Sequence, residues 1–213
     1  MNNYPEESLN YGYRIPLNSY IRVLHAAPGA PAVDVYVNGN LIAKNLSFEE
    51  ITSYIPVPPG KYQVEVFPAG EMTTPVISTN ITLPALTAMT IAAIGEMPNI
   101  SLYPIPEVYM PQINPQKSYV RFAHLSPNAP AVDVTLPGGT IVFENVKYQQ
   151  YTDYMKINPG TYTLQVRPTG TEAAVLTVPD VTFMPGTIYS VYATGLVGGE
   201  PPLSAIVVTD SKY

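Results

Sequence analysis

The chain has 213 residues, a formal net charge of −6 and only 12% charged residues. It contains no cysteine, which excludes disulfides, thiolate metal sites and cysteine nucleophiles. It has no cluster of Lys and Arg, so a nucleic-acid partner is not expected, because phosphate binding depends on such clusters. No apolar run approaches the ~20 residues of a membrane-spanning helix, so no transmembrane segment is expected either.

The first segment, residues 1–18, is rich in Asn, Tyr, Pro and Glu, a composition that predicts a flexible N-terminal arm. It lacks the basic start and apolar stretch of a secretory signal. After it comes S-Y-I-R-V-L-H-A-A-P-G-A-P-A-V-D-V from Ser19, which recurs from Ser118 as S-Y-V-R-F-A-H-L-S-P-N-A-P-A-V-D-V. The repeat predicts two domains, residues 19–107 and 118–213. Between them, residues 108–117 form a Pro-rich joint whose prolines favour an extended spacer.

Within each copy the apolar pattern has a period of two. Ile21 and Val23 alternate with Arg22 and Leu24, as in a half-buried strand. Val, Ile, Thr and Tyr dominate these runs, as β-structure prefers, and no segment shows a helical period over three turns. The fold class predicted is therefore all-β, with two tandem immunoglobulin-like β-sandwich domains of about seven strands each. In the first copy the strands are predicted near residues 19–26, 32–37, 50–57, 61–67, 76–83, 87–94 and 100–105.

Turn signals separate the strands. Asn38-Gly39 is a hairpin signal, and Pro-Gly precedes the strand that begins near Tyr62. Tyr62 and its counterpart Tyr162 are interpreted as corner residues that tie a strand to a neighbouring loop.

Six polar residues form a repeated set. Its members are Arg22, His25 and Asp34 in the first copy and Arg121, His124 and Asp133 in the second. A short proline loop separates His25 from Asp34 and would bring the two together. One interpretation is a His–Asp pair acting as general base, yet Ser126 has Ala27 as its counterpart, so no nucleophile recurs. We favour a structural polar cluster, in which Asp34 accepts N–H groups of the proline loop and pairs with His25 or Arg22. An unpaired buried group would cost about 1–3 kcal/mol.

Metal and phosphate sites are poorly supported. One His and one Asp in each copy leave a zinc site short of ligands. The segment from Asp34 lacks the side chains of a calcium loop, because Tyr36 and Asn45 occupy ligand positions. Gly60-Lys61 has no partner glycine five positions earlier. We therefore expect no cofactor, no metal and no catalytic residue.

The chain has 17 tyrosines, which supply rigid area suited to binding sugars, peptides or proteins. Those in the arm and around the joint are candidates for contact with a partner: Tyr4, Tyr11, Tyr13, Tyr103 and Tyr109.

The pattern H-x-x-P-x-A-P-A-V-D-V, followed by P-G-x-Y-x-[VL]-x-V, resembles a prokaryotic family catalogued as domain of unknown function 4397. The resemblance covers about residues 19–107 and 118–213. It implies tandem copies of a β-domain and a place at a bacterial cell surface or in a spore or envelope layer. It brings no catalytic residues with it.

The leading functional hypothesis is a non-catalytic structural or adhesion-type protein of such a layer. Its partner would be another copy of itself or another protein of the layer, and residues 1–18 could add a strand to a neighbour's sheet edge. The first alternative is a carbohydrate- or peptide-binding module that uses exposed tyrosines. The second is a hydrolase that uses His25 or His124 with the neighbouring Asp.

Overall fold

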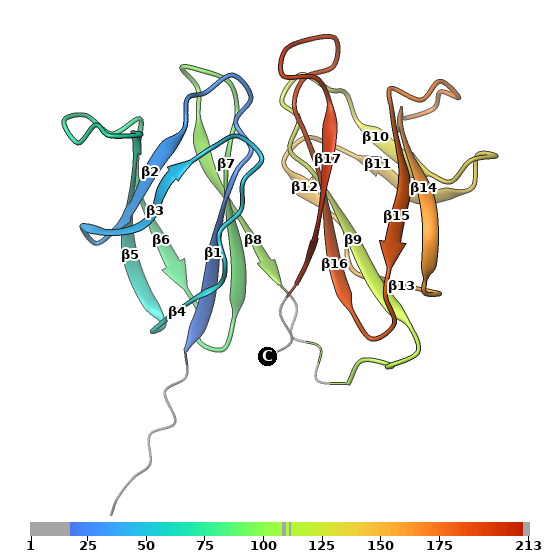
Figure 1. Ribbon diagram of the computed structural model, residues 1–213, viewed down its shortest axis with the longest axis horizontal. Coiled ribbons are helices and arrows are strands. Elements are labelled where there is room, and N and C mark those ends of the chain that lie inside the picture. The colour runs from blue at the N-terminus through green and yellow to red at the C-terminus, as the bar shows by residue number, and fades with distance from the viewer. Residues whose placement is uncertain (1–17, 108–109, 111, 211–213) are drawn as a thin grey trace, which may run out of the picture.

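The computed structural model describes residues 18–107, 110 and 112–210, and it contains no helix within these ranges (Figure 1). Each copy of the repeat forms a sandwich of two sheets, so the predicted all-β class and the two sandwich domains are confirmed. Most of the predicted arm, together with Tyr4, Tyr11, Tyr13 and Tyr109, lies outside the described residues.

The first sandwich consists of the sheets β4-β1-β7-β8 and β3-β2-β5-β6. Strands β1 and β7 run parallel, and the other pairs are antiparallel. The strands are β1 (Ser19–His25), β2 (Val33–Val37), β3 (Asn40–Leu46), β4 (Ile55–Val57), β5 (Gly60–Pro68), β6 (Ile77–Leu83), β7 (Ala88–Ile94) and β8 (Ser101–Glu107).

The second sandwich repeats this plan. One sheet has the order β12-β9-β16-β17, with β13 also pairing with β9, and the other has the order β11-β10-β14-β15. Strands β9 and β16 run parallel, as β1 and β7 do. The strands are β9 (Ser118–His124), β10 (Val132–Thr135), β11 (Ile141–Val146), β12 (Gln150–Tyr151), β13 (Met155–Ile157), β14 (Gly160–Pro168), β15 (Leu176–Phe183), β16 (Ile188–Thr194) and β17 (Ser204–Thr209).

The strands of the first copy differ from the prediction in two places. Residues 40–46 form β3, which was not predicted, because register shifts in its pairing with β2 break the alternation of apolar side chains. The strand predicted over 50–57 is only β4 at Ile55–Val57. The residues before it form a loop tied to β1 at Val23, whose backbone N–H donates to the Thr52 hydroxyl at 3.0 Å.

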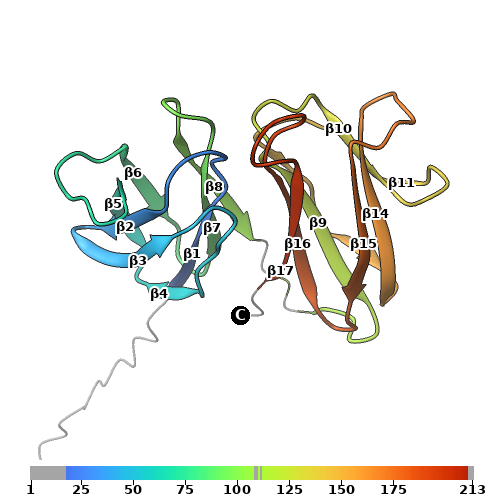
Figure 2. The ribbon, with the colours of Figure 1, turned by 45° about the horizontal axis from the view of Figure 1, so that its top comes forward.

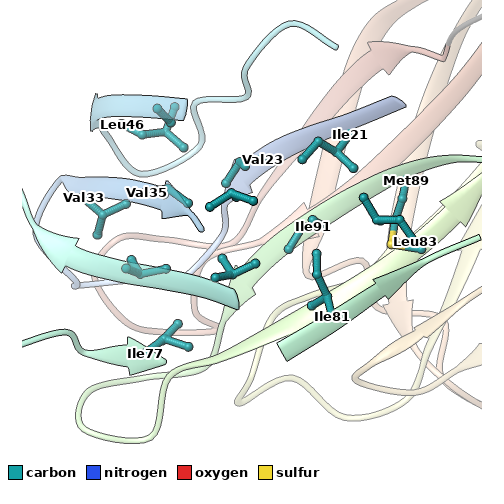
Figure 3. Packing of buried hydrophobic residues seen from close by; sticks show 14 residues of the cluster. Ile21, Val23, Val33, Val35, Leu46, Ile77, Ile81, Leu83, Met89 and Ile91 are labelled. Carbon is teal, nitrogen blue, oxygen red and sulfur yellow. The ribbon is translucent and has the colours of Figure 1, made fainter. Parts of the chain in front are cut away.

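The two faces of β1 and β7 serve different cores. Ile21, Val23 and Ile91 point into the first sandwich, where they pack against residues of β2, β5 and β6 (Figure 3). Leu24 and Ile94 point the other way, into a third apolar cluster that also contains residues of β9 and β16. The predicted alternation along β1 is therefore present.

The two sandwiches pack back to back through the sheets that contain β1 and β9 (Figures 1 and 2). Every residue of β7 and of β16 is buried as a result. The prediction of half-buried strands was wrong for the central strands of these sheets, since their second face meets the other domain rather than water. The two sandwiches are thus in direct contact through these sheets.

Candidate functional site

Two arginines lie in the interface between the sandwiches. Arg22 on β1 and Arg121 on β9 occupy the same place in the two copies, on the strand face that points away from their own core. Their exposed fractions are 3% and 1%. A guanidinium group is buried only when it is paired and hydrogen-bonded, so the partners of these side chains define the site.

The two arginines make reciprocal bonds across the interface. Nη1 of Arg22 donates to the carbonyl oxygen of Thr209 at 2.8 Å, at the end of β17. Nη1 of Arg121 donates to the carbonyl oxygen of Pro106 at 2.6 Å, near the end of β8. Each domain thus holds the last strand of the other, an arrangement with approximate two-fold symmetry.

Two carboxylates complete the charge balance. Asp210 forms ion pairs with Arg22 and, at 3.7 Å, with Arg121. Glu107 lies 3.4 Å from Nη2 of Arg22. Burial raises the pKa of Glu107, and the negative charge of Asp210 raises it further. Burial alone would lower the pKa of Arg22, but the surrounding phenols and carboxylates raise it overall, so this arginine stays charged.

Hydroxyl groups from both copies bind further polar atoms of the two arginines, although Nη2 of Arg121 has no hydrogen-bond partner within the described residues. Nε of Arg22 donates to Thr90 at 2.8 Å, and Nε of Arg121 donates to Ser190 at 2.6 Å. The phenol of Tyr192 crosses the interface to Thr90 at 3.1 Å.

Two repeated tyrosines cover the arginines. Tyr54 donates to Glu107, and Tyr154 donates to Asp210 at 2.5 Å. Their rings lie 4.5 and 4.7 Å from the guanidinium carbons of Arg22 and Arg121, within the range of cation–π attraction. Burial raises the pKa of both phenols, so both remain protonated donors. We call Arg22, Tyr54, Thr90, Glu107, Arg121, Tyr154, Ser190, Tyr192 and Asp210 the interface cluster.

The two histidines serve another purpose. Nε2 of His25 lies 3.0 Å from the carbonyl oxygen of Pro31, and Nδ1 accepts the backbone N–H of Ala27. Nε2 of His124 makes the same contact with Pro130 at 2.9 Å. Each ring therefore donates from Nε2 and closes the proline loop that follows it. Burial lowers the pKa of both imidazoles, which keeps them neutral near pH 7.

Acid is expected to weaken the fold through these rings. Because the folded pKa lies below the unfolded value of about 6.5, the unfolded chain binds more protons, and stability falls as the pH drops below about 6.5. Each histidine contributes a slope of up to about 1.4 kcal/mol per pH unit. Urea unfolding between pH 7.5 and 5.5 measures this slope. The double variant His25→Gln/His124→Gln should flatten it, and an unchanged slope would contradict the assignment.

Each of the two aspartates binds an irregular position in the edge strand of an outer sheet and a nearby turn. Asp34 accepts the backbone N–H groups of Asn45 at 2.7 Å and Gly70 at 2.9 Å, and these bonds lower its pKa. Asp133 makes the equivalent bonds to Asn145 and Gly170. Asn45 and Gly70 have positive φ values of 50° and 81°, so each carboxylate holds two tight bends.

The structure thus separates the three predicted polar residues of each copy. Arg22 joins the interface cluster, His25 holds the proline loop, and Asp34 binds one N–H group of strand β3 and one of the turn at Gly70. The pairing of His25 or Arg22 with Asp34 that the sequence suggested does not occur in the described structure. The hydrogen bonds of Tyr62 to Pro58 and of Tyr162 to Asn158 confirm the predicted corner tyrosines.

Sequence reasoning missed most of the interface cluster. Glu107 and Asp210 belong to no recognisable motif. Glu107 ends β8, and Asp210 directly follows β17. One signal was present, since A-M-T-I-A-A-I and I-Y-S-V-Y-A-T lack the polar alternation of a strand with a wet face. Such runs indicate burial on both faces and hence a partner layer.

Among the predicted partner-binding tyrosines, Tyr103 lies at the junction of the sandwiches. Its hydroxyl donates to the carbonyl oxygen of Gln149 at 2.5 Å, and its ring lies 6.3 Å from that of Tyr151. The two rings line an open hollow that also contains the side chains of Glu144 and Gln150.

Neither a metal site nor a membrane span emerges from the described part of the chain. It holds no group of three or more His, Asp or Glu side chains placed to bind a metal ion. It also holds no helix of the length and apolarity needed to cross a bilayer.

The model of the family "Domain of unknown function (DUF4397)" matches residues 19–135 and 118–213. The chain belongs to this family. The two matches begin at the two copies of the opening motif, and together they span both sandwiches of this DUF4397 protein. No curated protein matches the chain.

Three solved structures show weak similarity to this DUF4397 chain. The C-terminal domain of AlgF from P. aeruginosa is 24% identical, with a TM-score of 0.35, over 45% of this chain and 99% of that one. The Bacillus anthracis TIE protein is 11% identical, with a TM-score of 0.27, over 83% and 34%. A family CBM26 module from Eubacterium rectale Amy13K in complex with maltoheptaose is 9% identical, with a TM-score of 0.29, over 90% and 97%. At these TM-scores the similarities carry no argument about function.

Proposed function

We propose that this chain is a non-catalytic structural or adhesion-type protein of a bacterial surface or of a spore or envelope layer, and that it self-assembles through residues 1–18. The observation that carries the proposal is the interface cluster. The repeated arginines and the carboxylates beside them form hydrogen bonds and ion pairs that hold the two domains together. The histidines are likewise engaged in closing proline loops.

A catalytic role would require a different arrangement of these groups. A general base needs an accessible lone pair near a nucleophile, whereas His25 and His124 are each 1% exposed. Ser126 donates to the carbonyl oxygen of Gly195 at 2.6 Å, away from the interface cluster. These contacts favour a scaffold over a hydrolase.

Removal of residues 1–17 tests the assembly proposal. We expect the full chain to form particles larger than one copy in analytical ultracentrifugation, and the shortened chain to sediment as a monomer with unchanged circular dichroism. Monomers before and after the deletion would refute assembly through this segment.

A second candidate function is carbohydrate binding at the hollow beside Tyr103 and Tyr151. The exposed ring of Tyr151 and the half-buried ring of Tyr103, with Glu144 and Gln150 beside them, suit the apolar faces and hydroxyl groups of sugars. Tyr151 is 40% exposed, so its replacement by Ala should leave the fold intact. Binding on a glycan array that Tyr151→Ala abolishes would support this function, and an array with no binding would reject it.

A further inference from the structure

The second sandwich contains an apolar cavity of about 220 Å³ between its two sheets. Fourteen residues line it, nearly all of them aliphatic or aromatic. Two of these, Ile141 on β11 and Met155 on β13, are 51% and 38% exposed, so the cavity opens at the edge where these two strands lie. Apolar cavities of about 150 Å³ bind a benzene ring, so this one has room for a larger aromatic group.

The N-terminal segment supplies such groups at regular intervals. Residues 9–17 read L-N-Y-G-Y-R-I-P-L, in which every second residue is apolar: Leu9, Tyr11, Tyr13, Ile15 and Leu17. In an extended chain these side chains share one face. This is the pattern of a strand that adds to a sheet edge and places alternate side chains in pockets.

The segment and the cavity belong to opposite flanks of the molecule. The chain enters the first sandwich at β1, whose Arg22 contacts Thr209 and Asp210 beside β17. In the sheet of the second sandwich, β17 is at one edge and β13 pairs with β9 at the other side. The described chain therefore begins on the flank of β17, whereas the cavity opens on the flank of β13.

We infer that residues 9–17 of one copy dock at the β11–β13 edge of a second copy and insert a tyrosine ring into the apolar cavity. This inference rests on the proposed assembly and names its contact. Thr140 also lines the cavity and supplies a hydroxyl partner for the phenol, which needs one when buried. Because donor and acceptor are different surfaces, the contact is heterologous and joins copies head to tail into a ring or an open filament.

The test uses full-length variants with matched controls. Ile141→Glu places a charge at the mouth of the cavity, and Leu41→Glu does so at the equivalent exposed position of the first sandwich. In the inserting segment, Tyr11→Ser/Tyr13→Ser removes the two rings. The control Asn10→Ser/Arg14→Ser changes residues on the opposite face of the same extended segment. We expect association to weaken by at least about tenfold in Ile141→Glu and Tyr11→Ser/Tyr13→Ser, but not in their controls.

Mixing the two defective variants provides the decisive measurement. Ile141→Glu keeps an intact donor, and Tyr11→Ser/Tyr13→Ser keeps an intact cavity, so an equimolar mixture should give dimers and no larger species in mass photometry. As a second block, Val142→Trp fills the cavity, with Ile42→Trp as its counterpart in the first sandwich.

The outcomes separate this inference from the proposed function. If deletion of residues 1–17 abolishes assembly while Ile141→Glu and Val142→Trp assemble like the wild type, the segment docks elsewhere. In that case the inference is wrong, but the proposed function still holds. A mixture that stays monomeric also overturns it. If the wild-type chain does not assemble at all, the proposed function fails with it.

Discussion

Replacement of Asp210 by Asn is expected to destabilise the protein by about 3–5 kcal/mol, because it leaves two buried guanidinium groups facing the single carboxylate of Glu107. Urea unfolding followed by circular dichroism measures the loss. Glu172→Gln, at an exposed position, is the control and should change stability by less than about 0.5 kcal/mol.

A charge-balanced variant sharpens this prediction. Arg22→Met/Asp210→Leu removes one positive and one negative group together, so its loss should be well below the sum of the two single losses. A loss below about 1 kcal/mol for Asp210→Asn would show that the interface cluster does not depend on this carboxylate.

Replacement of Gly195 by Ala is expected to cost about 2–5 kcal/mol. Gly195 has a φ of 76°, and a Cβ atom there would lie 2.1 Å from the carbonyl oxygen of Pro202. Because the blocking atom belongs to the backbone, the chain that leads into β17 would have to move. The free energy of this displacement adds to the strain of an alanine in the left-handed conformation.

Gly198 provides a matched control for this substitution. Its φ is 68°, but no atom lies within 4 Å of the Cβ that Ala would add. Gly198→Ala therefore tests conformational strain alone and should cost about 1–2 kcal/mol. Equal losses in the two variants, measured by thermal or urea unfolding, would contradict the steric argument.

The parts of the fold that could be predicted are those with a regular alternation of apolar and polar residues. The alternation of Ile21 and Val23 with Arg22 and Leu24 gave the correct face for each side chain, because strand geometry fixes a period of two. Strand β3 escaped prediction because register shifts beside Val35 disrupt that period.

The candidate site depends on pairings that a single sequence does not specify. Arg22 meets Asp210 and Thr209 only because two sheets stack, and the residues are separated by almost the whole chain. A partner for Arg22 was sought in Asp34, which is near in sequence but lies in the opposite sheet of the sandwich. The apolar and small residues of β7 and β16 were the signal that a second layer covers these strands.

The ion pair between Arg22 and Asp210 also decides how the molecule would respond to tension. It joins the first strand of one sandwich to the residue that follows the last strand of the other, and the two ends of the described chain lie at the same end of the molecule (Figure 1). A pull applied at residues 18 and 210 would not stretch the sandwiches one after the other. It would load the contacts of Arg22 first and peel the two sandwiches apart from this end of their interface, while both apolar cores remain intact.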